Sequence, residues 1–267
     1  MSLPFARSLH YLIRDEVALR PSWWRLFRRV RQHKPIPGPI HRVLSTFAKE
    51  RDSVRFVQVG SNDASYGDSI MEYVLANGWQ GVLVEPVPYV FERLKRRHGR
   101  NPRFKLENVA IGQREGELPF YCLEPMEHPP TPYYDQMGSF SREHIEKHER
   151  FQPGLSQHIR EIKVRCITLT SLLKQHGLNR LDLLHVDAEG YDFDVLQSLD
   201  FGWCTPRMVL FESGHLPPAQ RVQCEAFLLA RGYRVVYEGR DCLALHDGQR
   251  GDCPQTARMF DIYSPEA

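Results

Sequence analysis

The side chains best suited to chemistry in this chain follow its apolar runs. A run at 54–59 ends in Gly60, and a second run at 82–84 ends in Glu85. Glycine lets the backbone turn without a Cβ clash, so the amides that follow can approach a ligand closely. A carboxylate on the next strand can accept hydrogen bonds from both hydroxyls of a ribose. This pairing predicts a site for a cofactor that carries adenosine.

The residues after Gly60 narrow the choice of cofactor. The dinucleotide fingerprint G-x-G-x-x-G is incomplete, because its second glycine position, 62, is Asn, and Ala64 supplies no glycine either. A cofactor without a pyrophosphate fits better, and S-adenosylmethionine is such a molecule. We expect Asn62 and Asp63 to meet its amino acid end, although Asp63 could instead cap a turn or helix.

The third apolar run contributes two more candidates, Asn108 and Ala110, which we expect in an adenine pocket. A local turn bond is the alternative for Asn108. The predicted cofactor-binding residues are Gly60, Ser61, Asn62, Asp63, Glu85, Pro86, Asn108, Ala110 and Asp187.

Four carboxylates follow the fourth run within eight positions, at Asp187, Glu189, Asp192 and Asp194. They cannot all be packed inward, because an unpaired buried charge costs several kcal/mol. Asp192 and Asp194 stand where the next helix begins, which favours a cap or helix-dipole role. Asp187 and Glu189 lie nearer the expected crevice, and we assign them to the reaction.

The fifth run is followed by Glu212 and His215, and a histidine can act as a general base near neutral pH. A structural role is the alternative for His215. The predicted catalytic residues are Asp187, Glu189 and His215.

Two histidines, His144 and His148, stand at a helical spacing that can bind a metal. Charged neighbours surround them, so we expect a solvated helix there and predict no metal ligands. The acids at 187, 189 and 212 could nevertheless hold a hard cation.

Short apolar runs alternate with helical segments, which is typical of a mainly parallel α/β sheet covered on both faces. The last two runs are joined by only three residues, so they must be antiparallel neighbours, with one reversed strand at the sheet edge. The predicted strands are 54–60, 81–85, 104–111, 181–187, 208–212, 233–238 and 242–246. The predicted helices are about 68–77, 89–98, 170–176, 193–199 and 219–231.

Two segments fall outside this alternation. Residues 1–53 are rich in arginine, and 22–33 predict an amphipathic helix with a basic face. That helix could contact an anionic membrane surface or an acidic substrate, or could simply cap the domain. Residues 124–160 form a proline-rich and charged insertion, which we interpret as a substrate-facing lid. The catalytic domain is then 54–267.

The composition is that of an ordinary globular protein, 42% hydrophobic and 25% charged, with a formal net charge of +2. This charge is too small to predict nucleic acid as a partner. Six cysteines without a C-x-x-C pair indicate reduced thiols, and no apolar span suffices for a secretion signal or a membrane crossing. We therefore expect a cytoplasmic protein, with its oligomeric state open.

Several blocks, in this order, resemble the FkbM family of S-adenosylmethionine-dependent methyltransferases. They are FVQVGSND at 56–63, DSI at 68–70, GVLVEP at 81–86, NVAIG at 108–112, LLHVDAEGYD at 183–192 and FE at 211–212. The resemblance implies a Rossmann-like, seven-stranded class I methyltransferase sheet, with cofactor contacts at Gly60, Asn62 and Glu85. It also implies O-methylation of a small-molecule or glycan hydroxyl. Ala64 stands where the family often has glycine.

The sequence therefore predicts an S-adenosylmethionine-dependent O-methyltransferase. Two alternatives remain: a cofactor-binding assembly module without catalysis, and a nicotinamide-dependent oxidoreductase. The missing glycines and the short final hairpin disfavour the oxidoreductase.

Overall fold

The computed structural model describes residues 38–65, 68–127, 129–131 and 134–264. The helix predicted at 22–33 lies outside these residues. Within them, no helix is both long and apolar enough to cross a membrane.

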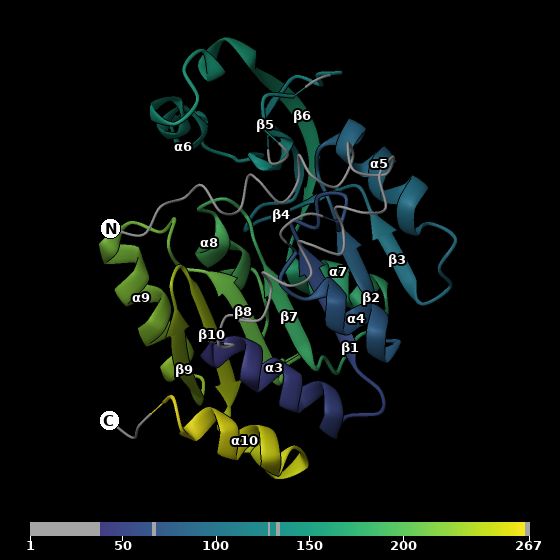
Figure 1. The fold of residues 1–267 in the computed structure, drawn as a ribbon, viewed down its shortest axis with the longest axis vertical. Helices are drawn as coiled ribbons and strands as arrows, with labels where there is room; N and C mark the ends of the chain where they lie inside the picture. The colour runs from purple at the N-terminus through teal and green to yellow at the C-terminus, as the bar shows by residue number, and fades with distance from the viewer. Residues whose placement is uncertain (1–37, 66–67, 128, 132–133, 265–267) are drawn as a thin grey trace, which may run out of the picture. The chain divides into compact units, whose positions relative to one another are not determined.

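A seven-stranded sheet forms the centre of the fold, in the order β3-β2-β1-β7-β8-β10-β9 (Figure 1). Its first five members pair in parallel, and β10 is antiparallel to both β8 and β9. The predicted antiparallel pair is confirmed, but its reversed strand is not at the edge, because β10 inserts between β8 and β9. The strands are β1 (Arg55–Val59), β2 (Gln80–Val84), β3 (Phe104–Glu107), β7 (Leu183–Val186), β8 (Met208–Glu212), β9 (Tyr233–Glu238) and β10 (Asp241–His246).

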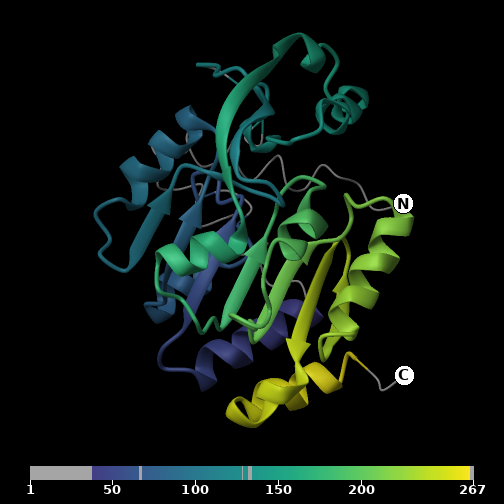
Figure 2. The ribbon, with the colours of Figure 1, turned by 180° about the vertical axis from the view of Figure 1, so that it is seen from behind.

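Helices cover both faces of this sheet, because its strands carry apolar side chains on both sides. In β1, Val57 and Val59 join the core beneath α7, α8 and α9, whereas Phe56 joins the core beneath α3, α4 and α10. Figures 1 and 2 show the two faces. The helices are α3 (Pro39–Glu50), α4 (Met71–Asn77), α5 (Pro88–His98), α7 (Leu169–Gln175), α8 (Asp192–Gln197), α9 (Pro218–Leu229) and α10 (Pro254–Asp261).

Helix α3 lies within the segment that the sequence analysis assigned to the N-terminal extension. It buries Val43, Leu44 and Phe47 in the same core as the sheet strands. Its carboxyl end is tied to α10, because Glu50 accepts hydrogen bonds from the backbone N–H of Gln255 and from both the N–H and hydroxyl of Thr256. Residues 39–50 are therefore part of the sheet domain in structural terms.

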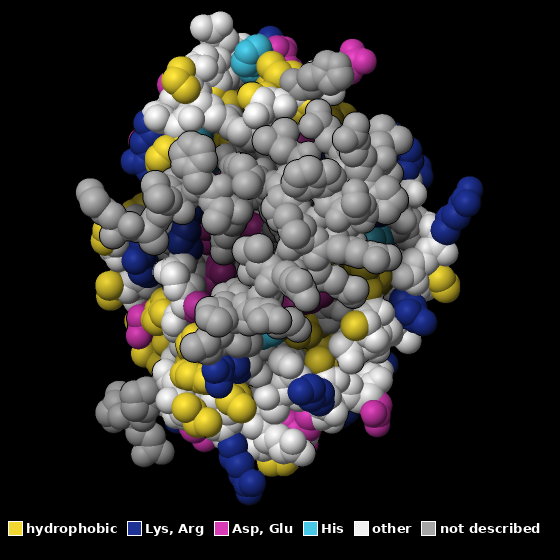
Figure 3. Space-filling view, viewed as in Figure 1, with side chains coloured by type: hydrophobic (Ala, Val, Ile, Leu, Met, Phe, Trp, Pro, Cys, Tyr) yellow, Lys and Arg dark blue, Asp and Glu magenta, His cyan; other side chains and the backbone are white. Residues whose placement is uncertain are grey.

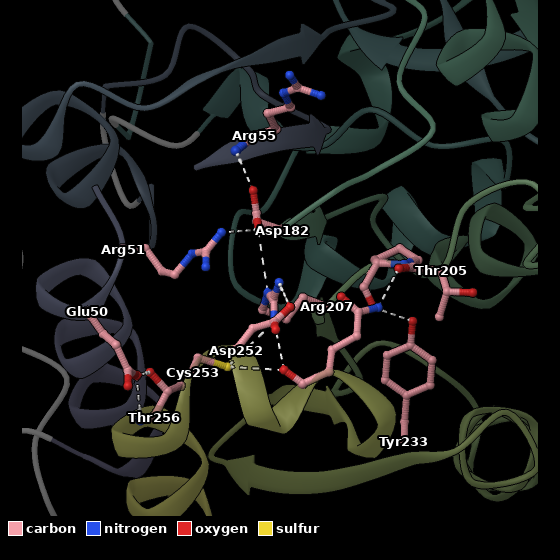
Figure 4. A network of polar contacts seen from close by, with 12 residues as sticks. Glu50, Arg51, Arg55, Asp182, Thr205, Arg207, Tyr233, Asp252, Cys253 and Thr256 are labelled. Carbon is pink, nitrogen blue, oxygen red and sulfur yellow. Dashed lines mark hydrogen bonds and ion pairs between the residues drawn. The ribbon is translucent and has the colours of Figure 1, made fainter. Parts of the chain in front are cut away.

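A polar network lies between the loops at the amino ends of the strands and α10 (Figure 4). Its centre is Arg207, whose guanidinium is buried and forms ion pairs with Asp182 at 3.4 Å and Asp252 at 3.0 Å. Arg51 also approaches Asp182, at 3.7 Å. The network joins the segments around Arg51, around Asp182 and Arg207, and around Asp252. It lies at the amino ends of the strands, opposite the carboxyl ends that carry the predicted site residues.

A second, three-stranded sheet stands apart from the first, in the order β4-β6-β5. Its strands are β4 (Ala110–Ile111), β5 (Gly116–Leu123) and β6 (Ile159–Ile167). The prediction of one strand over 104–111 is wrong, because the chain leaves the main sheet after Glu107 and re-pairs with β6 from Ala110. The antiparallel pairing of β5 with β6 was not predicted.

The predicted insertion is the connection between β5 and β6, and it rises above the main sheet in Figure 1. It contains α6 (Arg142–Glu146) and three short 3₁₀ helices, η2 (Tyr134–Gln136), η3 (Lys147–Arg150) and η4 (Leu155–His158). A further 3₁₀ helix, η5 (Asp247–Asp252), precedes α10. A small core of its own holds the insertion together, with Tyr134, Ile145 and Leu155 buried at its centre.

Candidate functional site

One cavity opens at the carboxyl ends of β1, β2 and β7, where parallel sheets bind ligands. Its empty volume is about 910 Å³, including space open to solvent. The lining includes five acids and, within the described part of the chain, neither lysine nor arginine. In the space-filling view, acidic side chains appear near the middle of this face and basic ones mostly around its margin (Figure 3). The acids are Asp68, Glu85, Asp135, Asp187 and Glu189.

Gly60 makes the turn that the sequence predicted, with a φ of 79°. A Cβ atom built at this position would lie 1.8 Å from the backbone oxygen of Asp187, so only glycine fits. Two non-glycine residues of the same loop, Asn62 and Ala64, also have positive φ, at 48° and 53°. Alanine at position 64 therefore adopts a left-handed conformation that costs about 1–2 kcal/mol and that glycine adopts freely.

Glu85 is buried at the end of β2 and lines the cavity. One carboxylate oxygen accepts a hydrogen bond from the backbone N–H of Asn62 at 3.0 Å, and the other accepts one from Val87 at 2.8 Å. Burial raises the pKa of Glu85 to about 7, despite these two bonds. An ionised carboxylate has about four acceptor sites, so two remain for a ligand.

Four polar side chains form one wall of the cavity, and sequence reasoning did not select them: Gln58, Asp68, Ser69 and His185. Gln58 donates to Asp68 at 2.7 Å, and Ser69 lies 3.1 Å from Nε2 of His185. Gln58 and His185 are buried, yet Oε1 of the first and Nδ1 of the second have no partner among the described residues. Buried unsatisfied atoms are uncommon, so this wall suits a polar ligand. A glutamine and a histidine inside otherwise apolar strands were the available sequence signal.

The other predicted cofactor residues divide between the cavity and its surroundings. Those that line it are Gly60, Ser61, Asn62, Glu85, Pro86, Ala110 and Asp187. Asp63 and Asn108 are not among the lining residues. Asp63 forms an ion pair with Arg97 at 3.2 Å, and the Asn108 amide donates to the backbone oxygens of Glu85 and Pro86. These bonds link Asn108 to the end of β2, 22 and 23 residues away, so the alternative of a local turn bond is wrong as well.

Asp187 leaves β7 directly beside Gly60 and is accessible from the cavity. Although the residue is exposed, desolvation by the surrounding protein raises the pKa of its carboxyl, with further increases from the negative charges of Glu189 and Glu212. A carboxylate of raised pKa is a stronger base than an ordinary one.

Asp192 lies in the first turn of α8, as the helix-dipole prediction expects, but it is not the N-cap residue, which is Tyr191. Its buried carboxyl accepts long hydrogen bonds from the N–H groups of Ala188 at 3.4 Å and Glu212 at 3.3 Å. It thereby bridges the loops after β7 and β8. Burial raises its pKa to about 8.

Glu189 points toward the insertion and meets two histidines. Its Oε2 lies 3.1 Å from Nε2 of His144 and 3.0 Å from Nδ1 of His215. Burial alone would raise the pKa of Glu189, but the contacts with both imidazoles outweigh it and lower the pKa to about 2. The prediction of a solvated position is wrong for His144, which is buried because α6 folds its inner face onto this loop.

The sequence matches the methyltransferase FkbM domain family over residues 58–235. No curated protein matches it. Among solved structures, an FkbM methyltransferase from Methylobacillus flagellatus is 12% identical with a TM-score of 0.45, covering 73% of this chain and 44% of that one. The N-terminal domain of human METTL16 is 14% identical with a TM-score of 0.42, covering 79% and 72%. The FkbM structure is thus matched over less than half of its length.

The observed strand order, with β10 reversed between β8 and β9, is the Rossmann-like sheet that the resemblance implied. The domain match covers this sheet from β1 into β9 and contains every residue of the cavity lining. The chain therefore belongs to the FkbM methyltransferase domain family, whose members as a class use S-adenosylmethionine.

Proposed function

We propose that this protein transfers a methyl group from S-adenosylmethionine to a hydroxyl of a sugar, glycan or natural-product acceptor. The observation that carries the proposal is the acid-lined cavity at the strand ends, with Glu85 in its lining. Family membership supports methyl transfer, and the cavity supports the choice of cofactor.

The cavity fits a cationic nucleoside. Glu85 retains two acceptor positions for a ribose diol, and the Gly60 turn removes the Cβ atom that would obstruct the approach. Gln58, Ser69 and His185 add polar side chains to the cavity wall, which suits the amino acid end. The bound cofactor supplies an electrophilic methyl group on a sulfonium, and the carboxylates of the cavity suit its positive charge.

The same electrostatics disfavour a nicotinamide dinucleotide. Its pyrophosphate carries negative charge, which proteins usually bind with glycine-rich amides, helix N-termini or basic side chains. Here five carboxylates line the cavity without a lining lysine or arginine in the described residues. The oxidoreductase alternative therefore lacks a place for its cofactor's phosphates.

The acceptor is expected on the insertion side of the cavity, where Phe120, Phe140 and Tyr191 form an aromatic wall. The rings of Phe120 and Phe140 meet edge to face at 5.0 Å, and those of Phe140 and Tyr191 lie 4.7 Å apart. Such a wall provides apolar contact for a flat sugar face or a ring. Tyr134, within the segment interpreted as a substrate-facing lid, is instead buried in the core of the insertion, and Tyr133 lies outside the described residues.

The residues of the cavity would contribute alignment and proton removal. Excluding water and orienting the acceptor hydroxyl provides about 7–11 kcal/mol in well-aligned reactions. We assign the hydroxyl proton to Asp187, because this exposed residue lines the cavity. Glu189 and His215 are engaged with each other, and we assign them to positioning the loops beside Asp187.

The direct test measures release of S-adenosylhomocysteine when the purified chain is mixed with S-adenosylmethionine and a panel of acceptors. We expect release with hydroxyl-bearing sugars or natural products, and none with the matching deoxy or O-methylated compounds. Cofactor binding without release on any hydroxyl acceptor would favour the non-catalytic assembly module. Release only with amines or RNA would overturn the proposed acceptor class.

The raised pKa of Glu85 predicts that cofactor affinity depends on pH. The ionised carboxylate accepts the ribose hydrogen bonds, and its pKa in the free protein is about 7. Below that pH, Glu85 must release a proton when the cofactor binds. The dissociation constant should therefore increase as the pH falls, by up to about tenfold for each pH unit. Calorimetry from pH 8 to pH 5.5 measures this slope. The Glu85→Gln variant, which cannot titrate, should show a flat profile, and a flat wild-type profile would contradict the assignment.

A further inference from the structure

Four possible metal ligands converge where the insertion meets the main sheet. Each offers one nitrogen or oxygen atom, and these atoms all lie within 4.8 Å of one another. Two come from the insertion, on α6 and η3, and two come from the loops after β7 and β8. We call this group the histidine cluster, and it consists of His144, His148, Glu189 and His215. We propose that the histidine cluster binds one divalent transition metal ion of the zinc type.

The chemistry of the donors selects this class of ion. Three imidazoles and one carboxylate suit Zn²⁺ and its neighbours, whereas Mg²⁺ and Ca²⁺ prefer oxygen ligands. Bond lengths of about 2.0–2.2 Å place tetrahedral ligand atoms about 3.4 Å apart. Two contacts already have this spacing, because Oε2 of Glu189 is 3.1 Å from His144 and 3.0 Å from His215. The other ligand atoms need to close by about 1.5 Å at most.

One carboxylate oxygen is the shared partner of two rings in this cluster. A single oxygen of Glu189 faces ring nitrogens from both His144 and His215. Nδ1 of His215 is buried without an aligned hydrogen bond, even though that oxygen is 3.0 Å away. The third ring, that of His148, stands edge to face with His215, with centroids 5.9 Å apart. A divalent cation between these nitrogens and the carboxylate would give each of them a ligand bond.

The surrounding backbone is shaped to bring these ligands together. Glu189 adopts a φ of 47°, a left-handed conformation that costs a non-glycine residue about 1–2 kcal/mol. A Cβ atom on the next residue, Gly190, would lie 2.9 Å from Nδ1 of His144. The hydroxyl of Ser139, from the insertion, donates to the backbone oxygen of Glu189 at 3.1 Å. Strain and close packing are thus concentrated where the ligands meet.

A second carboxylate supports the cluster from outside. Oε2 of Glu212 lies 3.3 Å from Nδ1 of His215, and Oε1 of Glu212 is held by Arg240 at 2.9 Å. This is the same ring nitrogen that faces Glu189, so Glu212 adds negative charge beside the cluster and does not hold the other nitrogen of His215.

With four protein ligands, a tetrahedral ion has no open coordination position, which is typical of structural metal sites. The ion would join the insertion to the loops after β7 and β8, beside the cavity that Glu189 also lines. We therefore assign it the role of a clamp that holds the insertion over the cavity edge. This inference replaces the expectation that the chain has no metal ligands, and it does not depend on the proposed methyl transfer.

The test uses the full chain without an affinity tag, stripped with a chelator and titrated with Co²⁺ and then Zn²⁺. We expect one equivalent to bind, with the visible absorption of tetrahedral Co²⁺ that Zn²⁺ abolishes. His148→Ala and His215→Ala should each weaken Zn²⁺ binding by about 100-fold or more. His158→Ala is the matched control, because this histidine of the insertion pairs with Glu124 instead, and it should bind Zn²⁺ like the wild type. Circular dichroism verifies that each variant is folded.

The clamp itself has a separate readout. Zn²⁺ should raise the midpoint of thermal unfolding and slow proteolysis within 124–160 in the wild type and in His158→Ala, but not in His148→Ala. Less than a tenth of an equivalent of bound metal, or equal affinity in His148→Ala and His158→Ala, would overturn the site. Tight binding without any change in proteolysis would overturn the clamp.

Discussion

Replacing Glu85 by alanine should weaken S-adenosylmethionine binding by about 100-fold or more. A charge-assisted hydrogen bond contributes about 1.5–3 kcal/mol, and a ribose diol would lose two of them. Each loss of about 1.4 kcal/mol raises the dissociation constant tenfold. The same substitution also removes the acceptor for the N–H groups of Asn62 and Val87, which loosens the Gly60 turn. Isothermal titration calorimetry measures the affinity directly.

Glu107→Ala is the matched control for this experiment. Glu107 ends the neighbouring strand β3, but it lies outside the cavity lining and bonds to Gln175 and His176. Its removal should change the cofactor affinity less than threefold. If Glu85→Ala remains folded by thermal unfolding and binds as tightly as this control, the ribose is held elsewhere and the assignment of the cavity is wrong.

The main sheet could be predicted because its information is local. Each strand is a short apolar run that ends at a glycine, proline or acid, and parallel strands place these ends at one edge. Gly60 and Glu85 were found for this reason. The position of β10 could not be predicted, because a three-residue link shows that two strands are neighbours but not which of them pairs with β8.

The second sheet depends on pairing across the insertion. Strand β6 contains the alternation Ile162, Val164 and Cys166, which is a period-two signal present in the sequence. Its partner β5 carries Pro119, which weakens any prediction of a strand. Only the pairing of two segments about forty residues apart makes both of them strands. Helix α3 was also not predicted, although Ile40, Val43, Leu44 and Phe47 have the apolar spacing of a helix.

The histidine cluster illustrates information that no local pattern holds. His144 and His148 show a metal-binding spacing, but charged neighbours at 143, 146, 147 and 149 make the segment resemble a solvated helix. Burial of its inner face depends on contacts with Glu189 and His215, which are more than forty residues away in the chain. Their convergence follows from tertiary packing of the insertion on two strand-end loops.

Replacing Asp187 by asparagine should lower the turnover number by about 10²–10⁴-fold, the usual contribution of a general base. The backbone of Asp187 packs against Gly60 and its N–H donates to Val59, so the side chain is fixed at the junction of β1 and β7. The amide keeps the shape of the carboxyl but cannot take the acceptor's proton, so cofactor affinity should change only a few fold. Single-turnover kinetics with an acceptor from the panel separates the two effects.

The control for Asp187→Asn is Asp194→Asn in the same acidic segment. Asp194 bonds to Gln113 at 2.9 Å, away from the cavity, so its substitution should leave turnover within twofold of the wild type. Because the sulfonium is already a strong electrophile, a small effect at Asp187 would mean that the acceptor loses its proton to water after methyl transfer. Turnover of Asp187→Asn within threefold of the Asp194→Asn control would remove Asp187 from the reaction and leave alignment as the protein's whole contribution.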